Sequence, residues 1–145
     1  MGVASTTPEA QIDALNAAFR THWLAASEDA ARIAWDTLPF NTDDVPDFVR
    51  FGFQHASGEH AALGAGASRY MRRFGIISAV IYVRMGEDPA RRHALTEIVL
   101  EFLEIVDVAG FSIEDPGASD EGVVEGWNQV NCTASAHYDL TRNTA

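Results

Sequence analysis

The sequence predicts an α+β fold, in which two main helices pack on a mostly antiparallel β-sheet and one long β-hairpin projects from the domain. Two observations support it. Segments with helical and with strand periodicity follow one another in the order helix, three strands, helix, two strands. Residues 69–83 also read as one strand that exceeds the ordinary strand length. The 145 residues are expected to form a single domain, 1–145.

The first helix is expected over residues 8–28. Thr6 and Glu9 have the spacing of a capping box, and Pro8 stands in the first turn. Apolar side chains then recur at helical intervals. They are Ile12, Leu15, Phe19, Trp23 and Ala26. A short strand at 32–35 and a turn-rich stretch, DTLPFNTDDVPD, are expected next.

The second and third strands are expected to pair as an extended hairpin. Residues 48–55 alternate apolar and polar, whereas residues 56–68 are small and glycine-rich, which predicts a mobile connection. At about 3.3 Å per residue, a strand over 69–83 reaches roughly 50 Å. From Ile76 to Val83 both of its faces are apolar, so each face needs cover. A strand that leaves the core and needs cover on both faces suggests a protein that assembles with copies of itself.

The second helix is expected to begin at Pro89, with Asp88 as its cap, and to end at Gly110. A short strand over 111–113, an exposed acidic turn, DPGASDEG, and a last strand over 123–138 follow. Aromatic and aliphatic side chains on the inward faces define the predicted core. It includes Trp35, Phe51, Ile77, Ile81, Phe102 and Trp127.

The composition excludes several classes of protein. Ten basic residues, all arginine, stand against 21 acidic residues, and the net charge of −11 disfavours general nucleic-acid binding. No apolar run reaches the length of a transmembrane helix, and the first residues lack a signal-peptide core, so an intracellular protein without a membrane partner is expected. The one cysteine, Cys132, excludes an internal disulfide.

No cluster of residues predicts catalysis, a metal site or a cofactor. His55, Glu59 and His60 are of metal-ligating types, but they stand in or beside a glycine-rich loop where solvation alone explains them. His93 and Glu97 have the spacing of an exposed pair on one helix face. Cys132 lies among apolar residues with no base placed to activate it.

Charged residues gather in two kinds of segment. The acidic candidates are Asp43, Asp44, Asp47, Glu114, Asp115, Asp120 and Glu121, expected on two solvated loops. The basic group is Arg69, Arg72 and Arg73, which alternate with Tyr70, Met71 and Phe74. These arginines either solubilise the hairpin stem or, with Tyr70 and Phe74, form a subunit interface that meets the acidic loops of an adjacent copy.

Several anchors carry a resemblance to a known family. They are Trp35 with Pro39 and Phe40, Arg73 and Gly75 around Phe74, the turn and helix start from Gly86 to Ala90, and Gly126 with Trp127. Over about residues 30–140 the chain resembles the tail-terminator and tail-completion proteins of long-tailed phages and phage-like particles, including gene-transfer agents.

The resemblance implies a structural virion protein of the tail neck region, assembled in the host cytoplasm and without catalysis. It implies a hexameric ring that caps the tail-tube protein and joins the head-side connector (stopper) protein. Six copies would carry 66 net negative charges, so acidic residues around the hole would let DNA pass without adhering. A tail-tube or neck subunit is the alternative. A small metal-dependent enzyme using His55, His60 and the carboxylates of 43–47 is a remote one.

Overall fold

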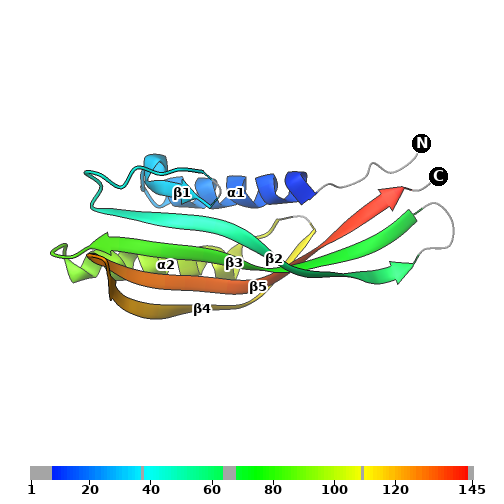
Figure 1. Cartoon of the computed structure of the whole chain (residues 1–145). Helices are drawn as coiled ribbons and strands as arrows, with labels where there is room; N and C mark the ends of the chain where they lie inside the picture. Colours follow the sequence, from blue (N-terminus) through cyan, green and yellow to red (C-terminus); the bar gives the residue numbers. More distant parts are fainter. Residues whose placement is uncertain (1–7, 37, 64–67, 109, 144–145) are drawn as a thin grey trace.

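The structure, a computed structural model, describes residues 8–36, 38–63, 68–108 and 110–143, with the backbone alone at 57–63, 68–71 and 140–143. Five strands form one sheet in the order β1-β2-β3-β5-β4. Two long helices lie along this sheet (Figure 1). Their bounds and those of the strands are α1 (Pro8–Ala25), a 3-10 turn η1 (Ala30–Arg32), β1 (Ile33–Trp35), β2 (Asp47–Leu63), β3 (Ser68–Arg84), α2 (Pro89–Ile105), β4 (Phe111–Val124) and β5 (Trp127–Asn143). Among the described strands, β1 and β2 pair in parallel and every other pair is antiparallel, which confirms the predicted α+β fold.

Both helices pack on the same face of the sheet. From α1, Phe19 stacks on Phe51 of β2 with ring centroids 4.1 Å apart, and it meets Phe102 of α2 edge to face at 5.1 Å. The helix α2 in turn contacts β3, β4 and β5. Predicted core residues Phe51, Ile77, Ile81 and Phe102 lie in this layer, each at most 2% exposed, and Trp35 packs against it.

The opposite side of the sheet, called the open face below, carries no helix in the described part of the chain (Figure 1). In β3, residues 77, 79, 81 and 83 are buried under the helices, so the alternate residues face the other way. The register extends this face over the other strands. It presents Arg50, Gln54, Ile76, Ser78, Val80, Tyr82, Ser112, Glu114, Gln129, Asn131, Thr133, Ser135 and His137.

The helix ends differ from the predicted ones. The first helix stops at Ala25, because Ser27 adopts a left-handed conformation (φ 65°) and the Trp23 indole donates a hydrogen bond to the Asp29 carbonyl at 2.8 Å. Thr6, the predicted cap, lies outside the described residues. The Asp88 carboxylate caps α2 by accepting from the Ala90 amide, as predicted. That helix ends at Ile105 rather than at Gly110, since Val106 is already extended.

The prediction of a loop over 56–68 is wrong for most of that segment. The strand β2 continues to Leu63 and β3 begins at Ser68, with register shifts at 55–58 and 59–62. Small residues carry little β propensity, but here paired backbone groups along β3 override it. The strand β5 follows β3 along its whole length, from Trp127 opposite Arg84 to Asn143 opposite Ser68. The distal part is therefore three-stranded, and the projection of a long β-hairpin from the domain stays a prediction.

The predicted acidic turn is also wrong, because DPGASDEG lies within β4. This strand pairs with β5 at the edge of the sheet and accommodates Pro116 and the glycines through irregularities at 114–117 and 120–122. The turn stands instead at Glu125 and Gly126, which both have positive φ (51° and 85°). Such a pair is typical of a two-residue hairpin turn.

Gly75 leaves no room for a side chain. A Cβ atom here would stand 2.3 Å from the Gln54 carbonyl oxygen and 2.5 Å from the Phe53 ring. We expect Gly75→Ala to lower the free energy of unfolding by about 1–3 kcal/mol, measured by urea denaturation. Gly117→Ala is the control, because a Cβ atom there would meet no atom of the described residues within 4 Å. Equal urea midpoints for the two variants would contradict the close approach.

Candidate assembly surface

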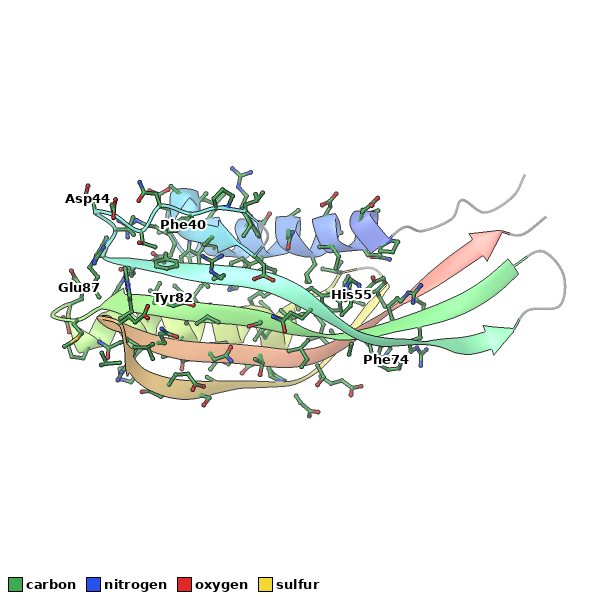
Figure 2. All side chains as sticks on the ribbon, viewed as in Figure 1. Phe40, Asp44, His55, Phe74, Tyr82 and Glu87 are labelled. Atoms are coloured by element: carbon green, nitrogen blue, oxygen red, sulfur yellow. The ribbon has the colours of Figure 1, made fainter. Side chains whose placement is uncertain are left out.

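An aromatic cluster occupies one end of the open face. Phe48 stacks on Tyr82, with ring centroids 4.5 Å apart, and meets Trp127 edge to face at 5.2 Å. Phe40, from the segment before β2, covers Phe48 at 4.8 Å, so that Phe48 is only 3% exposed (Figure 2). This segment therefore covers one end of the open face and leaves the rest uncovered.

Arg84 holds the covering segment in place. Its guanidinium donates to the carbonyls of Val45 at 2.8 Å and Thr42 at 2.6 Å, and it stacks on Trp127 with its central carbon 4.4 Å from the ring centroid. Trp127 is thus half-buried on the open face rather than in the core, which corrects the predicted core set. The sequence does not predict these contacts of Arg84, because Thr42, Val45 and Trp127 all lie far from it in the chain.

Trp127→Ala is expected to lower the free energy of unfolding by about 1–2 kcal/mol, since the ring loses its contacts with Arg84 and Phe48 but was only partly buried. Phe102→Ala is the comparison, because a core aromatic costs about 3–5 kcal/mol. Both values come from urea denaturation. Equal losses would mean that Trp127 is as important to the core as Phe102.

The middle of the open face is uncovered. Ile76 is 45% exposed, and Val80 and Tyr82 are half-buried beside it. Polar side chains of β5 border this apolar strip on one side, and Arg50 and Gln54 of β2 border it on the other. Within the strip, the Ser78 hydroxyl donates a hydrogen bond to the Asn131 side-chain oxygen at 3.4 Å. An apolar centre with a polar border is typical of a surface that another protein covers.

The predicted basic interface is only partly available. Arg72 forms an ion pair with Asp139 of the same chain at 2.9 Å, and this hydrogen bond lowers the pKa of Asp139. Arg72 thus has a partner within its own chain, and its pairing with a neighbouring copy stays a prediction. Phe74 lies on the open face against His137, with ring centroids 5.6 Å apart. The side chains of Arg69 and Tyr70 lie outside the described residues.

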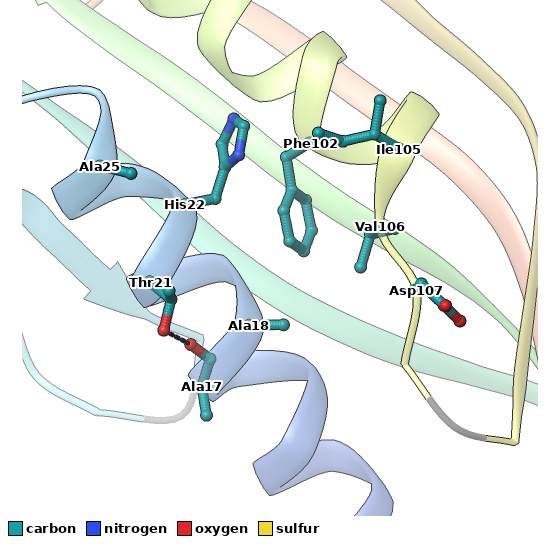
Figure 3. Close-up of a pocket in the computed structure, with 9 residues that line it drawn as sticks. All are labelled: Ala17, Ala18, Thr21, His22, Ala25, Phe102, Ile105, Val106 and Asp107. Carbon is teal, nitrogen blue, oxygen red and sulfur yellow. Dashed lines mark hydrogen bonds between the residues drawn. The ribbon is translucent and has the colours of Figure 1, made fainter.

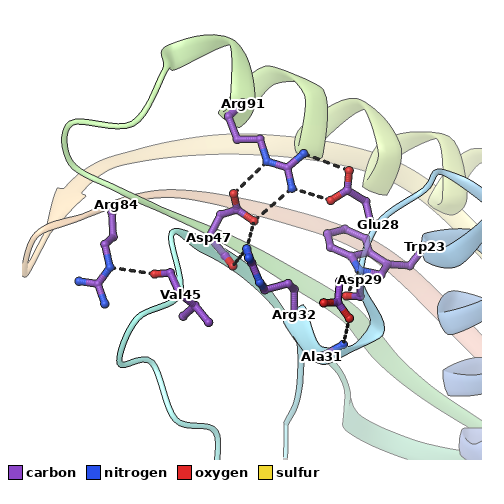
Figure 4. A network of polar contacts seen from close by, with 9 residues as sticks. All are labelled: Trp23, Glu28, Asp29, Ala31, Arg32, Val45, Asp47, Arg84 and Arg91. Carbon is purple, nitrogen blue, oxygen red and sulfur yellow. Dashed lines mark hydrogen bonds and ion pairs between the residues drawn. The ribbon is translucent and has the colours of Figure 1, made fainter.

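The sequence predicts a solvated loop at Asp47, and this prediction is wrong. Asp47 lies at the start of β2, where its buried carboxylate forms two ion pairs (Figure 4). It is 4% exposed and accepts from Arg91 at 2.9 Å and from Arg32 at 3.2 Å. Arg91 also holds Glu28, and the hydrogen bonds to Glu28 and Asp47 raise the pKa of Arg91. Because Asp47 is enclosed, it cannot line a lumen. It joins β2 to η1 and to the first turn of α2.

The other acidic candidates are exposed. Asp43 and Asp44 lie on the segment before β2, whereas Glu114, Asp115, Asp120 and Glu121 lie on the edge strand β4. Asp120 pairs with Arg92 of α2 at 3.4 Å. The two predicted loops are therefore one loop and one strand.

A groove of about 470 Å³ lies between α1 and α2 (Figure 3). Its walls are mostly apolar, including Ala18, Phe102 and the exposed Ile105. His22 lines it, but its ring nitrogen already bonds the Ile98 carbonyl at 3.0 Å. Asp107 also lines the groove, but among the described residues it forms no hydrogen bond or ion pair with His22. The groove thus mainly offers space for an apolar group.

Of the metal candidates His55, Glu59 and His60, only His55 has a described side chain, and the side chains of the other two lie outside the described residues. Among the side chains that are described, no group of three or more metal-ligating residues is found. His55 bonds the Tyr138 hydroxyl at 2.6 Å. Cys132 is fully buried, and burial raises the pKa of its thiol to about 12. In the described residues no helix is both long and apolar enough to cross a bilayer.

Comparisons with known proteins show a shared fold and no family. No family model matches the sequence, and no curated protein matches it. Ten solved chains match the fold. One of them, which carries a sequence identifier in place of a functional name, is 12% identical to this chain with a TM-score of 0.58. The match covers 87% of this chain and 94% of the other, so the likeness extends over most of both chains and concerns the fold alone.

Proposed function

We propose that this protein is a structural subunit of a phage-like tail. It closes into a ring at the end of the tail tube, joins the tube to the head-side connector, and lets DNA pass through the hole. The resemblance of residues 30–140 to tail-terminator proteins supports this function. The observation that carries it is the open face, where Ile76 is 45% exposed beside Val80 and Tyr82.

Self-assembly follows from the physical chemistry of this face. Covering the apolar strip by a neighbouring copy removes it from water, which stabilises the contact by about 25 cal/mol for each Å² of apolar surface. A contact that uses different surfaces on the two partners repeats from copy to copy, and it closes into a ring when the rotation permits. The exposed acidic residues around such a hole would repel the phosphates of DNA.

Native mass spectrometry and electron microscopy of the purified protein, alone and with the tail-tube protein of the same source, test this function. We expect closed particles of a single stoichiometry that stop tube elongation. Open-ended polymers formed by this chain alone would support the tube subunit instead. A protein that stays monomeric even in the presence of tubes would contradict both functions.

A further inference from the structure

A second feature of the open face is a cup at its distal part, which Phe74 helps to line. Figure 2 labels Phe74 there. The volume of the cup is about 230 Å³. Three strands, β3, β4 and β5, supply most of its walls, and Ala56 of β2 completes it. The lining residues that can interact with a ligand are Phe74, Ser112, Glu114, Ser135 and His137.

The cup has the chemistry of a site for a cation with several hydrogen-bond donors. Glu114 is exposed and forms no ion pair within the described chain, and two serine hydroxyls stand beside it. His137 has a buried ring nitrogen, Nδ1, without a hydrogen-bond partner in the described structure. The Phe74 ring adds a surface on which a flat cation stacks. Among the described residues, no basic side chain other than that histidine lines the cup. A guanidinium group, which is planar and donates five hydrogen bonds, suits these partners.

The chain itself can supply this cation only as arginine, because it contains no lysine. Five of the arginines whose side chains are described already have partners. These five are Arg32, Arg72, Arg84, Arg91 and Arg92. The side chains of Arg69 and Arg142 lie outside the described residues. Of the arginines that are described, Arg20, Arg50 and Arg73 make no hydrogen bond or ion pair with another described residue. Arg20 is exposed on α1, and Arg73 lies opposite Tyr138 on the helix-covered face. Arg50 alone of these three lies on the open face.

Arg50 cannot reach the cup of its own molecule. It pairs in register with Val80, which pairs with Asn131 of β5. His137 stands six residues farther along β5 than Asn131, which corresponds to about 20 Å at roughly 3.4 Å per residue. That separation exceeds the length of an arginine side chain. Arg50 can therefore fill the cup only of another molecule.

We propose that Arg50 of one copy inserts into the cup of the next copy, where its guanidinium pairs with Glu114 and stacks on Phe74. This inference rests on the proposed self-assembly and specifies its contact. Each copy gives Arg50 to one neighbour and receives Arg50 from the other, so the contact is head-to-tail and suits a ring. Glu114 then belongs to the subunit contact and leaves the set of residues around the hole.

Charge reversal tests the pair. Arg50→Glu places two carboxylates at the contact, and Glu114→Arg places two guanidinium groups there. We expect each variant alone to assemble about tenfold or more weakly than the wild-type chain. An equimolar mixture of the two variants should assemble again when the copies alternate. One contact then joins the introduced carboxylate at position 50 to the introduced guanidinium at position 114, and the next contact joins the wild-type Arg50 to the wild-type Glu114, so every contact has opposite charges. Sedimentation velocity measures the assembled fraction, and Arg20→Glu, on the exposed surface of α1, should leave it unchanged.

The double variant Arg50→Glu with Glu114→Arg gives the sharper test, because each copy then carries both reversed charges. Every head-to-tail contact in its ring again joins a carboxylate to a guanidinium, and we expect assembly close to that of the wild-type chain. A double variant that assembles no better than the two single variants would overturn the inference.

The outcomes separate this inference from the proposed function. If the wild-type chain forms rings and Arg50→Glu forms them equally well, the pair is wrong and the ring function stands. A wild-type chain that fails to assemble, alone or with tubes, would contradict the proposed function itself.

Discussion

Asp47→Ala is expected to destabilise the fold by about 3–5 kcal/mol, because removal of one member of a buried ion pair leaves its partners uncompensated. The Asp47 side chain is 5% exposed and holds both Arg32 and Arg91. These two arginines come from η1 and α2, so the carboxylate joins three elements that lie far apart in the sequence. Urea denaturation, with its midpoint and slope, measures the loss.

The matched control is Asp120→Ala, which removes a carboxylate from a more exposed pair. Asp120 is 55% exposed and stands 3.4 Å from Arg92. Exposed ion pairs contribute little, so we expect a change within about 1 kcal/mol. If the two variants unfold at the same urea concentration, the buried network does not contribute as we infer. Asp47→Asn adds a second comparison, because it keeps the size of the side chain and removes its charge.

Ile76→Glu is expected to abolish assembly while leaving the fold intact. Ile76 is 45% exposed, so its replacement costs the isolated subunit little stability. In the assembled ring the same carboxylate would be buried against apolar surface without a partner, which is costly. Sedimentation velocity reports the assembly, and circular dichroism with thermal unfolding reports the fold.

Leu24→Glu provides the control for that experiment. Leu24 is 47% exposed, almost the same as Ile76, but it lies on α1, away from the open face. We expect this variant to assemble as the wild-type chain does. Should Leu24→Glu block assembly and Ile76→Glu permit it, the helix side of the molecule would be the contact surface, and the open face would be irrelevant to the ring.

The structure agrees with the sequence where the pattern is local and strong. The alternation of residues 76–83 predicted two faces of one strand, and Ile77 and Ile81 are fully buried while Ile76 is exposed. The pairing of Asp88 and Pro89 predicted the start of α2. By contrast, the segment 114–121 reads as a turn, because proline, glycine and acidic residues disfavour strands. Only its pairing with β5 makes it a strand, and such pairing is not visible in the segment itself.

The candidate surface residues likewise include some whose surroundings only the tertiary structure determines. Asp47 reads like its neighbours Asp43 and Asp44, and nothing in the local sequence distinguishes a buried carboxylate from two exposed ones. The distinction comes from Arg32 and Arg91, which are brought to Asp47 by the packing of η1 and α2. Likewise Arg72 reads as a free interface residue until β5 places Asp139 beside it.

Neighbouring residues and composition are enough to specify the two-faced character of β3, the apolar stripes of the helices, the start of α2 and the strong negative charge. Tertiary packing, by contrast, is what brings both helices to one face of the sheet and leaves the other open. It also brings Arg50 and the cup around Glu114 to that same open face. These outcomes depend on contacts between segments far apart in the chain, and the free energy of such contacts is not encoded in any local pattern.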